Sequence, residues 1–253
     1  MEWMRDRALE VDLLALQEHR LVNHEARRSA EDWAKVRGYS LRVPAAISTG
    51  DHAMATLAGV AVGTRRDIGQ ALMAPRELRH HSPRLAALEV SAVLKGGVVF
   101  VSGYQDTWDG GSVCFDMGTL NRLEDLGSFL RLLKKPWILA MDWQREPRIL
   151  QESGWADRVG GVIVAADTKT CTSGKGRVLD YFVVQRCLAP FVKGVEVLVS
   201  APTAPHHPVL LRMKWGPMGR DHHPGGAVEG VPSPPPDRVR QASGRARVVL
   251  GVR

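Results

Sequence analysis

The sequence predicts an α/β (α+β) fold in which two β-sheets pack face to face as a sandwich and helices flank them, four layers in all. Many short apolar runs are bounded by glycine, proline and polar residues, two of them form a hairpin pattern, and few segments show the spacing of a helix. Strands and helices do not alternate regularly, which disfavours a βαβ series. At 253 residues, with apolar runs spread evenly, the chain suits one large domain.

The first part of the chain predicts two helices and two strands. A short helix is expected over residues 2–10 and a strand over 12–17. Residues 25–37 are expected to form a helix that ends at Gly38, because glycine adopts the positive φ of a helix end without strain. The run Gly-Val-Ala-Val at 59–62 predicts a short buried strand.

A hairpin and a leucine-rich helix follow. Residues 84–94 and 98–104 lie on either side of a glycine turn, and Tyr104 ends the second strand. Thr119 is the expected cap of a helix that stops before Pro136. The apolar side chains of this helix recur at spacings of three and four and are Leu120, Leu123, Leu126, Leu130 and Leu133.

Five further apolar runs complete the two sheets. Their length and their content of β-branched and aromatic residues are typical of buried strands. They are expected over residues 137–142, 161–165, 178–185, 194–199 and 208–213.

Composition changes at residue 216. Residues 216–253, called the tail below, are rich in proline, glycine and arginine and are expected to be disordered, outside a domain of residues 1–215. The tail has six arginines against three acidic residues, so it holds three of the seven surplus positive charges. The remaining surface is mildly basic. It suits a polyanionic partner, although an ordinary mixed-charge surface is the better explanation of so small a surplus.

Other classes of protein are disfavoured. No apolar stretch approaches the ~20 residues of a membrane span, and the N-terminus lacks the apolar segment of a secretory signal. The three cysteines, Cys114, Cys171 and Cys187, cannot all pair with one another. We therefore expect no membrane association and a reducing compartment, the nucleus or the cytoplasm.

Four apolar runs lead to residues suited to catalysis, namely Glu18, Asp142, Asp180 and His206. In layered α/β proteins, functional side chains gather where buried strands reach the edge of a sheet. These four side chains are therefore expected to share one cleft. A cleft rich in carboxylates favours a hard metal cation.

Each of these residues also has a simpler explanation. An aspartate after a strand, such as Asp142, is common in turns, and an extended backbone would bring Gln144 close to it. Asp180 lies in an apolar run, where an unpaired carboxylate is strongly destabilising. His206 is a candidate partner because a carboxylate orients an imidazole and favours its protonated form, although paired histidines in a loop are usually solvated.

In this order, the motifs QE, MDWQ, RVLDYFVV and HHPV resemble the endonuclease/exonuclease/phosphatase family over roughly residues 9–214. The family includes abasic-site and retroelement endonucleases and phosphatases of lipid or inositol phosphates. The strand at 59–62 matches the family's GGVAI-like strand. The resemblance implies that Glu18 is the metal-binding glutamate, that Tyr104 is the tyrosine at a strand end, and that Asp180 orients the catalytic His206.

Two motif positions and one strand depart from the family pattern. Gln144 stands where the family's GDFN motif has asparagine, beside Asp142 in the place of its aspartate. Pro205 stands where the SDHxPV motif has aspartate, and proline cannot replace a charge. The family's first strand, which carries an asparagine about a helix's length before QE, has no counterpart, so the chain resembles a family member that is truncated at its N-terminus and lacks a central strand.

The resemblance implies a phosphodiester hydrolase that uses Mg²⁺, or Mn²⁺ in its place, bound chiefly by Glu18. Asp142 and Gln144 would orient or deprotonate the attacking water. His206, Asp180 and Tyr104 would stabilise charge on the phosphate. A nuclease is the first hypothesis, since short loops between the motifs leave little room for the extra elements of lipid-directed relatives.

Two alternatives stay open. A non-catalytic descendant would keep the scaffold and bind nucleic acid or a protein, and Pro205 and Gln144 favour it. A truncated reading frame that folds poorly would give a broad, non-cooperative melt.

Overall fold

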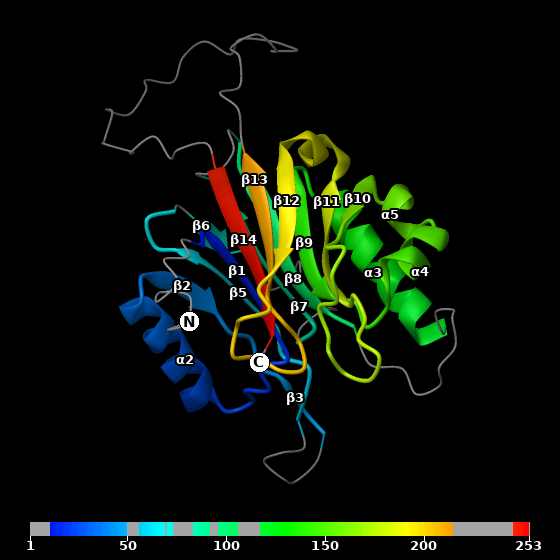
Figure 1. Cartoon of the computed structure of the whole chain (residues 1–253). Helices are drawn as coiled ribbons and strands as arrows, with labels where there is room; N and C mark the ends of the chain where they lie inside the picture. Colours follow the sequence, from blue (N-terminus) through cyan, green and yellow to red (C-terminus); the bar gives the residue numbers. More distant parts are fainter. Residues whose placement is uncertain are drawn as a thin grey trace, which may run out of the picture.

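Two six-stranded sheets pack against each other in the computed structural model, with helices outside both (Figure 1). The structure describes residues 11–49, 56–68, 70–72, 83–91, 96–105, 117–214 and 245–252. The predicted sandwich of sheets flanked by helices is confirmed. Among the helices described, none combines the length and apolar character that a membrane span requires.

The first sheet is mixed, and helix α2 (His24–Val36) packs beside its edge strand β2. Asn23 caps this helix by accepting a hydrogen bond from the Glu25 backbone N–H at 2.7 Å. In spatial order the strands are β12 (Val192–Val197), β13 (Val209–Lys214), β14 (Arg245–Val252), β1 (Leu13–Gln17), β5 (Ala61–Arg65) and β2 (Tyr39–Arg42).

Helices α3 (Met117–Leu132), α4 (Pro147–Glu152) and α5 (Trp155–Arg158) lie on the side of the second sheet that faces away from the first (Figure 1). In spatial order its strands are β10 (Gly161–Val164), β11 (Asp180–Gln185), β9 (Trp137–Asp142), β8 (Val98–Tyr104), β7 (Leu85–Val90) and β6 (Gln70–Leu72). A small ribbon, β3 (Ile47–Ser48) with β4 (Thr56–Leu57), and a 3₁₀ helix, η2 (Arg186–Phe191), complete the described elements.

Alternation along strand β9 divides the core into two parts. Ile138 and Ala140 face the first sheet, whereas Trp137, Leu139 and Met141 face the helices. Successive side chains of a strand point to opposite faces, so Asp142 continues the row that faces the first sheet. The strand therefore delivers its aspartate to the end of the space between the sheets.

Strand β14 contradicts the predicted disorder of the tail for residues 245–252. It pairs in parallel with β1 and antiparallel with β13, so it lies in the middle of the first sheet. Its Val248, Val249 and Leu250 are at most 2% exposed. The prediction was wrong because this short apolar run follows a long stretch rich in proline and glycine, whose composition dominated the interpretation.

The same strand fills the place of the strand thought to be missing. A strand connected through a helix to the next strand of the same sheet usually lies parallel and close to it. Here β14 is the parallel neighbour of β1, with Leu13 opposite Val248 and Gln17 opposite Val252. The first sheet is thus continuous from β12 to β2, and the expected gap in it is absent from the described residues.

Most of the remaining predicted elements are confirmed with small shifts. The helix predicted at 25–37, the hairpin and the strands from residue 137 onward are present. Helix α3 begins at Met117, so Thr119 lies inside its first turn rather than at its cap. Strand β11 begins at Asp180, and β5 begins at Ala61. The helix expected at 2–10 lies outside the described residues.

Candidate active site

Three predicted site residues lie side by side across the second sheet. Strand pairing places Tyr104 of β8 opposite Asp142 of β9, and Asp142 opposite Asp180 of β11. All three are at most 4% exposed. The strands therefore align the Tyr104 phenol and the two carboxylates at the same edge of the sheet. For the two carboxylates, the sequence predicted this position from the apolar runs beside them.

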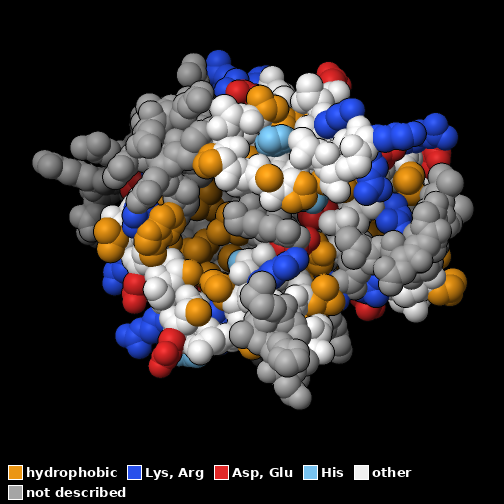
Figure 2. Space-filling view, turned by 60° about the horizontal axis from the view of Figure 1, so that its bottom comes forward, with side chains coloured by type: hydrophobic (Ala, Val, Ile, Leu, Met, Phe, Trp, Pro, Cys, Tyr) orange, Lys and Arg blue, Asp and Glu red, His pale blue; other side chains and the backbone are white. Residues whose placement is uncertain are grey.

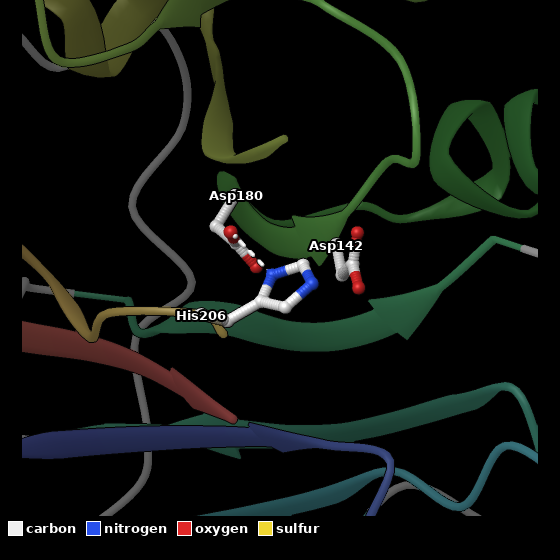
Figure 3. Close-up of side chains that lie close together, drawn as sticks. All are labelled: Asp142, Asp180 and His206. Atoms are coloured by element: carbon white, nitrogen blue, oxygen red, sulfur yellow. Dashed lines mark hydrogen bonds and ion pairs between the residues drawn. The ribbon is translucent and has the colours of Figure 1, made fainter. Parts of the chain in front are cut away.

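His206 reaches this edge from the first sheet, in the loop before β13. Its backbone bridges to Cys171, and the neighbouring His207 N–H donates to the Thr170 carbonyl at 2.7 Å. This short ladder joins the loop to the one that precedes β11. The His206 Nδ1 atom lies 2.8 Å from Asp180 Oδ2, so the predicted pair is present. The other ring nitrogen lies on the side of Asp142 (Figure 3).

Thr170 is a partner of Asp180 that the sequence did not indicate. Its hydroxyl donates to Asp180 Oδ2 at 2.7 Å and accepts from the backbone N–H groups of Leu179 and Asp180. The residue is fully buried. Its hydroxyl thus fixes both the start of β11 and the carboxylate, but only the folded loop brings it there, ten positions before Asp180.

Gln144 holds the Asp142 carboxylate from the next turn. Its backbone N–H donates to Oδ1 at 3.1 Å and its side-chain amide donates to Oδ2 at 2.7 Å. Both carboxylate oxygens therefore have a fixed orientation. Gln144 makes both contacts from a backbone with a positive φ of 52°.

Glu18 follows the last residue of β1 and is 6% exposed. Its neighbour Gln17 donates to Ser102 Oγ at 2.9 Å across the interface between the sheets, which fixes the end of β1 against β8. The Glu18 carboxylate receives a hydrogen bond from Arg20 at 3.1 Å. Its charge also raises the pKa of Asp142 and of His206, which places it in the same electrostatic environment.

Backbone strain is concentrated here. Among the described residues, four that are not glycine have a positive φ, and Glu18, Arg20 and Gln144 are three of them. Each such conformation costs on the order of 1–3 kcal/mol and occurs preferentially at functional sites. The strain independently marks the ends of β1 and β9 as a site.

The carboxylates at the site repel one another, and His206 lies among them. Burial raises the pKa of Asp142 well above its ordinary value, and the Asp180 carboxylate raises it further. Burial lowers the pKa of His206, but the hydrogen bond and charge of Asp180, with the charges of Asp142 and Glu18, outweigh burial and raise it overall. A protonated imidazole is therefore favoured beside Asp142, whose buried carboxylate requires a cation or a proton.

The donor set fits a divalent cation. Ligand atoms of Asp142, Asp180 and His206 all lie within 4.8 Å of one another. Asp180 Oδ1 is buried and has no hydrogen-bond partner, which is costly for a carboxylate oxygen unless a cation faces it. Carboxylate oxygens are the ligands that Mg²⁺ and Mn²⁺ prefer.

Replacing Asp142 with asparagine is expected to stabilise the metal-free protein at neutral pH. An acid whose pKa is raised by folding contributes stability below its unfolded pKa and loses it as pH rises through the folded pKa. Near pH 7.5 in EDTA, Asp142→Asn should therefore raise the free energy of unfolding by about 1–2 kcal/mol. Each kcal/mol corresponds to a rise of ~2–4 °C in Tm.

The advantage of the asparagine variant should shrink as the pH is lowered from 7.5 to 5, because burial and the Asp180 charge favour the protonated form of wild-type Asp142. Urea unfolding at both pH values measures this difference. Asp157→Asn, at an exposed ion pair with Arg186, is the matched control and should show little change. A destabilised Asp142→Asn at pH 7.5 would contradict the assigned electrostatics.

Figure 2 shows the face of the molecule at this edge. Acidic and histidine side chains reach the surface near its centre, and Lys and Arg side chains lie around them. Described basic residues near the site include Arg20, which contacts Glu18, Arg145, which follows Gln144, and Arg84 and Arg122, which line a pocket together with Tyr104. Positive charge around an acidic centre suits a polyanion that brings a phosphate to the carboxylates.

The structure brings together most of the residues that the sequence selected. Asp142, Asp180 and His206 form one cluster, Gln144 contacts it, and Tyr104 lies on the adjacent strand. Glu18 stands outside the tightest cluster and is paired with Arg20. The carbonyl of Pro205 accepts hydrogen bonds from Thr172, so this proline helps to anchor the histidine loop but offers no charge.

No protein-family model matches the sequence, and no curated protein does. Solved structures match with probability 1.00. An AP endonuclease from Leishmania major has a TM-score of 0.58 at 16% identity, over 82% of this chain and 79% of that one. A 3′ phosphatase, NExo, from Neisseria, solved with a product DNA hairpin, has a TM-score of 0.57 at 18% identity, over 85% and 92%.

The endonuclease domain of TRAS1, a telomere-specific non-LTR retrotransposon, has a TM-score of 0.52 at 12% identity, over 78% of this chain and 95% of that domain. All three neighbours have TM-scores above 0.5, and at such identities the likeness concerns the fold. It agrees with the motif order in the sequence. The chain has the fold of the endonuclease/exonuclease/phosphatase family.

Proposed function

We propose that this protein is a metal-dependent phosphodiester hydrolase that acts on nucleic acid, a nuclease. The observation that carries the proposal is the buried cluster of Asp142, Asp180 and His206, in which two carboxylates face each other beside an imidazole that favours its protonated form. Such a cluster is destabilising in an apoprotein and suits the binding of a cation and a phosphate. The neighbours whose names state nuclease or phosphatase activity support this choice.

The proposal assigns a role to each side chain. Glu18 would be the chief residue to hold Mg²⁺ or Mn²⁺, which when bound would neutralise charge on the phosphate. Asp142, oriented by the Gln144 amide, accepts a proton from the attacking water. His206, held by Asp180, and the Tyr104 hydroxyl donate to phosphate oxygens as negative charge develops.

The direct test is cleavage of labelled nucleic acid by the purified chain. DNA duplexes with and without an abasic site, single-stranded DNA and RNA are incubated with Mg²⁺, with Mn²⁺ or with EDTA. We expect cleavage that requires the divalent ion, and a loss of about 10²–10³-fold in rate for Glu18→Ala, because one electrostatic contact in the transition state is worth this much.

Glu25→Ala is the matched control, since Glu25 is an exposed glutamate in the first turn of α2. It should cleave at the wild-type rate. Cleavage that persists in EDTA, or that Glu18→Ala leaves unchanged, would rule out the proposed metal-dependent reaction.

A second candidate is a nucleic-acid binding module without turnover. One observation favours it: Pro205 supplies no carboxylate. In that case affinity would fall steeply with salt, as for any phosphate-binding surface, but no product would form.

A further inference from the structure

A pocket opens beside the candidate active site, between the strand ends and helix α3. Its volume is about 270 Å³, close to the lower end of the ~300–1,000 Å³ typical of ligand sites. Tyr104 and Met141 line it, and Met141 directly precedes Asp142. The pocket therefore begins at the residues that carry the proposed chemistry and extends towards the helix side of the sheet.

Most of the wall is apolar. Leu85, Leu126 and Met141 form its buried part, at no more than 4% exposure, and Ile47 and Pro83 are partly exposed. Tyr104 adds an aromatic ring. A wall of this kind matches a flat, apolar ligand, and bases commonly stack on aromatic and apolar side chains.

Polar groups lie on the same lining, and its two arginines, Arg84 and Arg122, are partly exposed. Arg122 is held in place by two neutral partners. Its guanidinium donates to Thr119 Oγ1 at 3.1 Å and, when the Gln105 amide is oriented with its oxygen towards Arg122, to that oxygen at 3.2 Å. These partners orient the guanidinium without cancelling its charge. A positioned guanidinium binds a phosphate with two parallel hydrogen bonds.

Asp125 narrows the choice of ligand. Its exposed carboxylate lies on the lining one helical turn from Arg122, and it accepts hydrogen bonds only. A carboxylate suits an exocyclic amine of a base and repels a phosphate. The lining thus offers apolar contact for a ring, an acceptor for its edge and cations for the attached phosphate, which together describe a nucleotide.

We propose that this pocket, lined by Tyr104, Met141, Leu126 and Arg122, binds the base of the nucleotide adjacent to the phosphate that is cleaved. The inference rests on the proposed function, because it makes the substrate a strand whose base is turned out of the stack or unpaired. A fully paired and stacked base does not reach such a pocket.

The test measures binding in EDTA, so that turnover plays no part. Fluorescence anisotropy compares a fluorescein-labelled DNA hexanucleotide with the same sugar–phosphate chain lacking its bases. The wild-type protein should bind the oligonucleotide with bases about five- to hundredfold more tightly, the range of a stacked base. Arg122→Gln should weaken its binding about tenfold.

Two variants separate the pocket from the general charge of the surface. Arg131→Gln removes an exposed arginine from the same helix, outside the pocket, and should change affinity less than twofold. Ile47→Trp places a bulky ring on the lining without removing a polar group and should abolish the preference for bases. An unchanged Tm shows that a variant is folded.

Equal binding of the two strands by the wild-type protein would overturn the proposal. So would equal losses in Arg122→Gln and Arg131→Gln, a comparison that holds even where Ile47→Trp does not fold. A preference for bases in a protein that cleaves nothing would refute the proposed hydrolase activity but support the base-binding pocket. Cleavage without any preference for bases would support the hydrolase activity and refute the pocket.

Discussion

A chain that ends at Lys214 is expected to lose cooperative unfolding altogether. The truncation removes β14, the strand that β1 and β13 both pair with, and so splits the first sheet in its middle. The buried Val248, Val249 and Leu250 alone contribute about 1.5–3 kcal/mol each. The loss of these contributions and of two ladders of hydrogen bonds is comparable to the whole ~5–15 kcal/mol that stabilises a domain.

Urea titration followed by far-UV circular dichroism measures the effect. The full chain should show one sharp transition and the truncated chain a broad one or none. In the full chain, Leu250→Ala should lower the free energy of unfolding by about 2–5 kcal/mol, since it leaves a core cavity. Arg212→Ala, at an exposed ion pair on the adjacent β13, should cost less than about 1 kcal/mol. A truncated chain that melts like the full one would show that β14 is dispensable.

The second expected result concerns the pair of His206 and Asp180. If the protein cleaves nucleic acid as proposed, His206→Gln should lower kcat by about 10³–10⁴-fold, because it removes the donor to the phosphate. Asp180→Asn should lower kcat by about 10²–10⁴-fold, although this carboxylate acts through the imidazole that it orients. The double variant should be no slower than His206→Gln.

The pH profile distinguishes positioning from a merely structural role. His206 donates in its protonated form, so activity is lost as pH rises through its raised pKa. Asp180→Asn removes the hydrogen bond and the charge that raise this pKa, and the alkaline limb should move to lower pH. Additive losses in the double variant, or an unmoved limb, would contradict the assignment. Asp157→Asn again serves as the control.

Much of the candidate site was predictable because buried strands appear in the sequence as short apolar runs whose ends can be recognised. A residue at the end of a buried strand lies at the edge of the sheet, so Glu18, Asp142 and His206 were recognisable from the apolar runs beside them. The order of the motifs added Tyr104 and the role of Asp180. The register of β8, β9 and β11, which puts these residues opposite one another, is not a property of any single strand.

The rest depended on contacts between distant segments. Thr170 meets Asp180 only through the fold of its loop, and Gln17 meets Ser102 only because the two sheets pack. Arg122 and Met141 line one pocket although they lie on a helix and a strand. Local composition does not indicate such pairings, because each contact forms only when the fold brings the two distant segments together.

By itself, the sequence determined the sandwich of sheets and helices and the residue types at the edge that holds the candidate active site, since alternation and strand ends are local patterns. Only the tertiary structure decided what becomes of residues 245–252. Their run of apolar residues is too short to outweigh the proline-rich stretch before it. The two ladders offered by β1 and β13, together with a buried face on either side, make it a central strand.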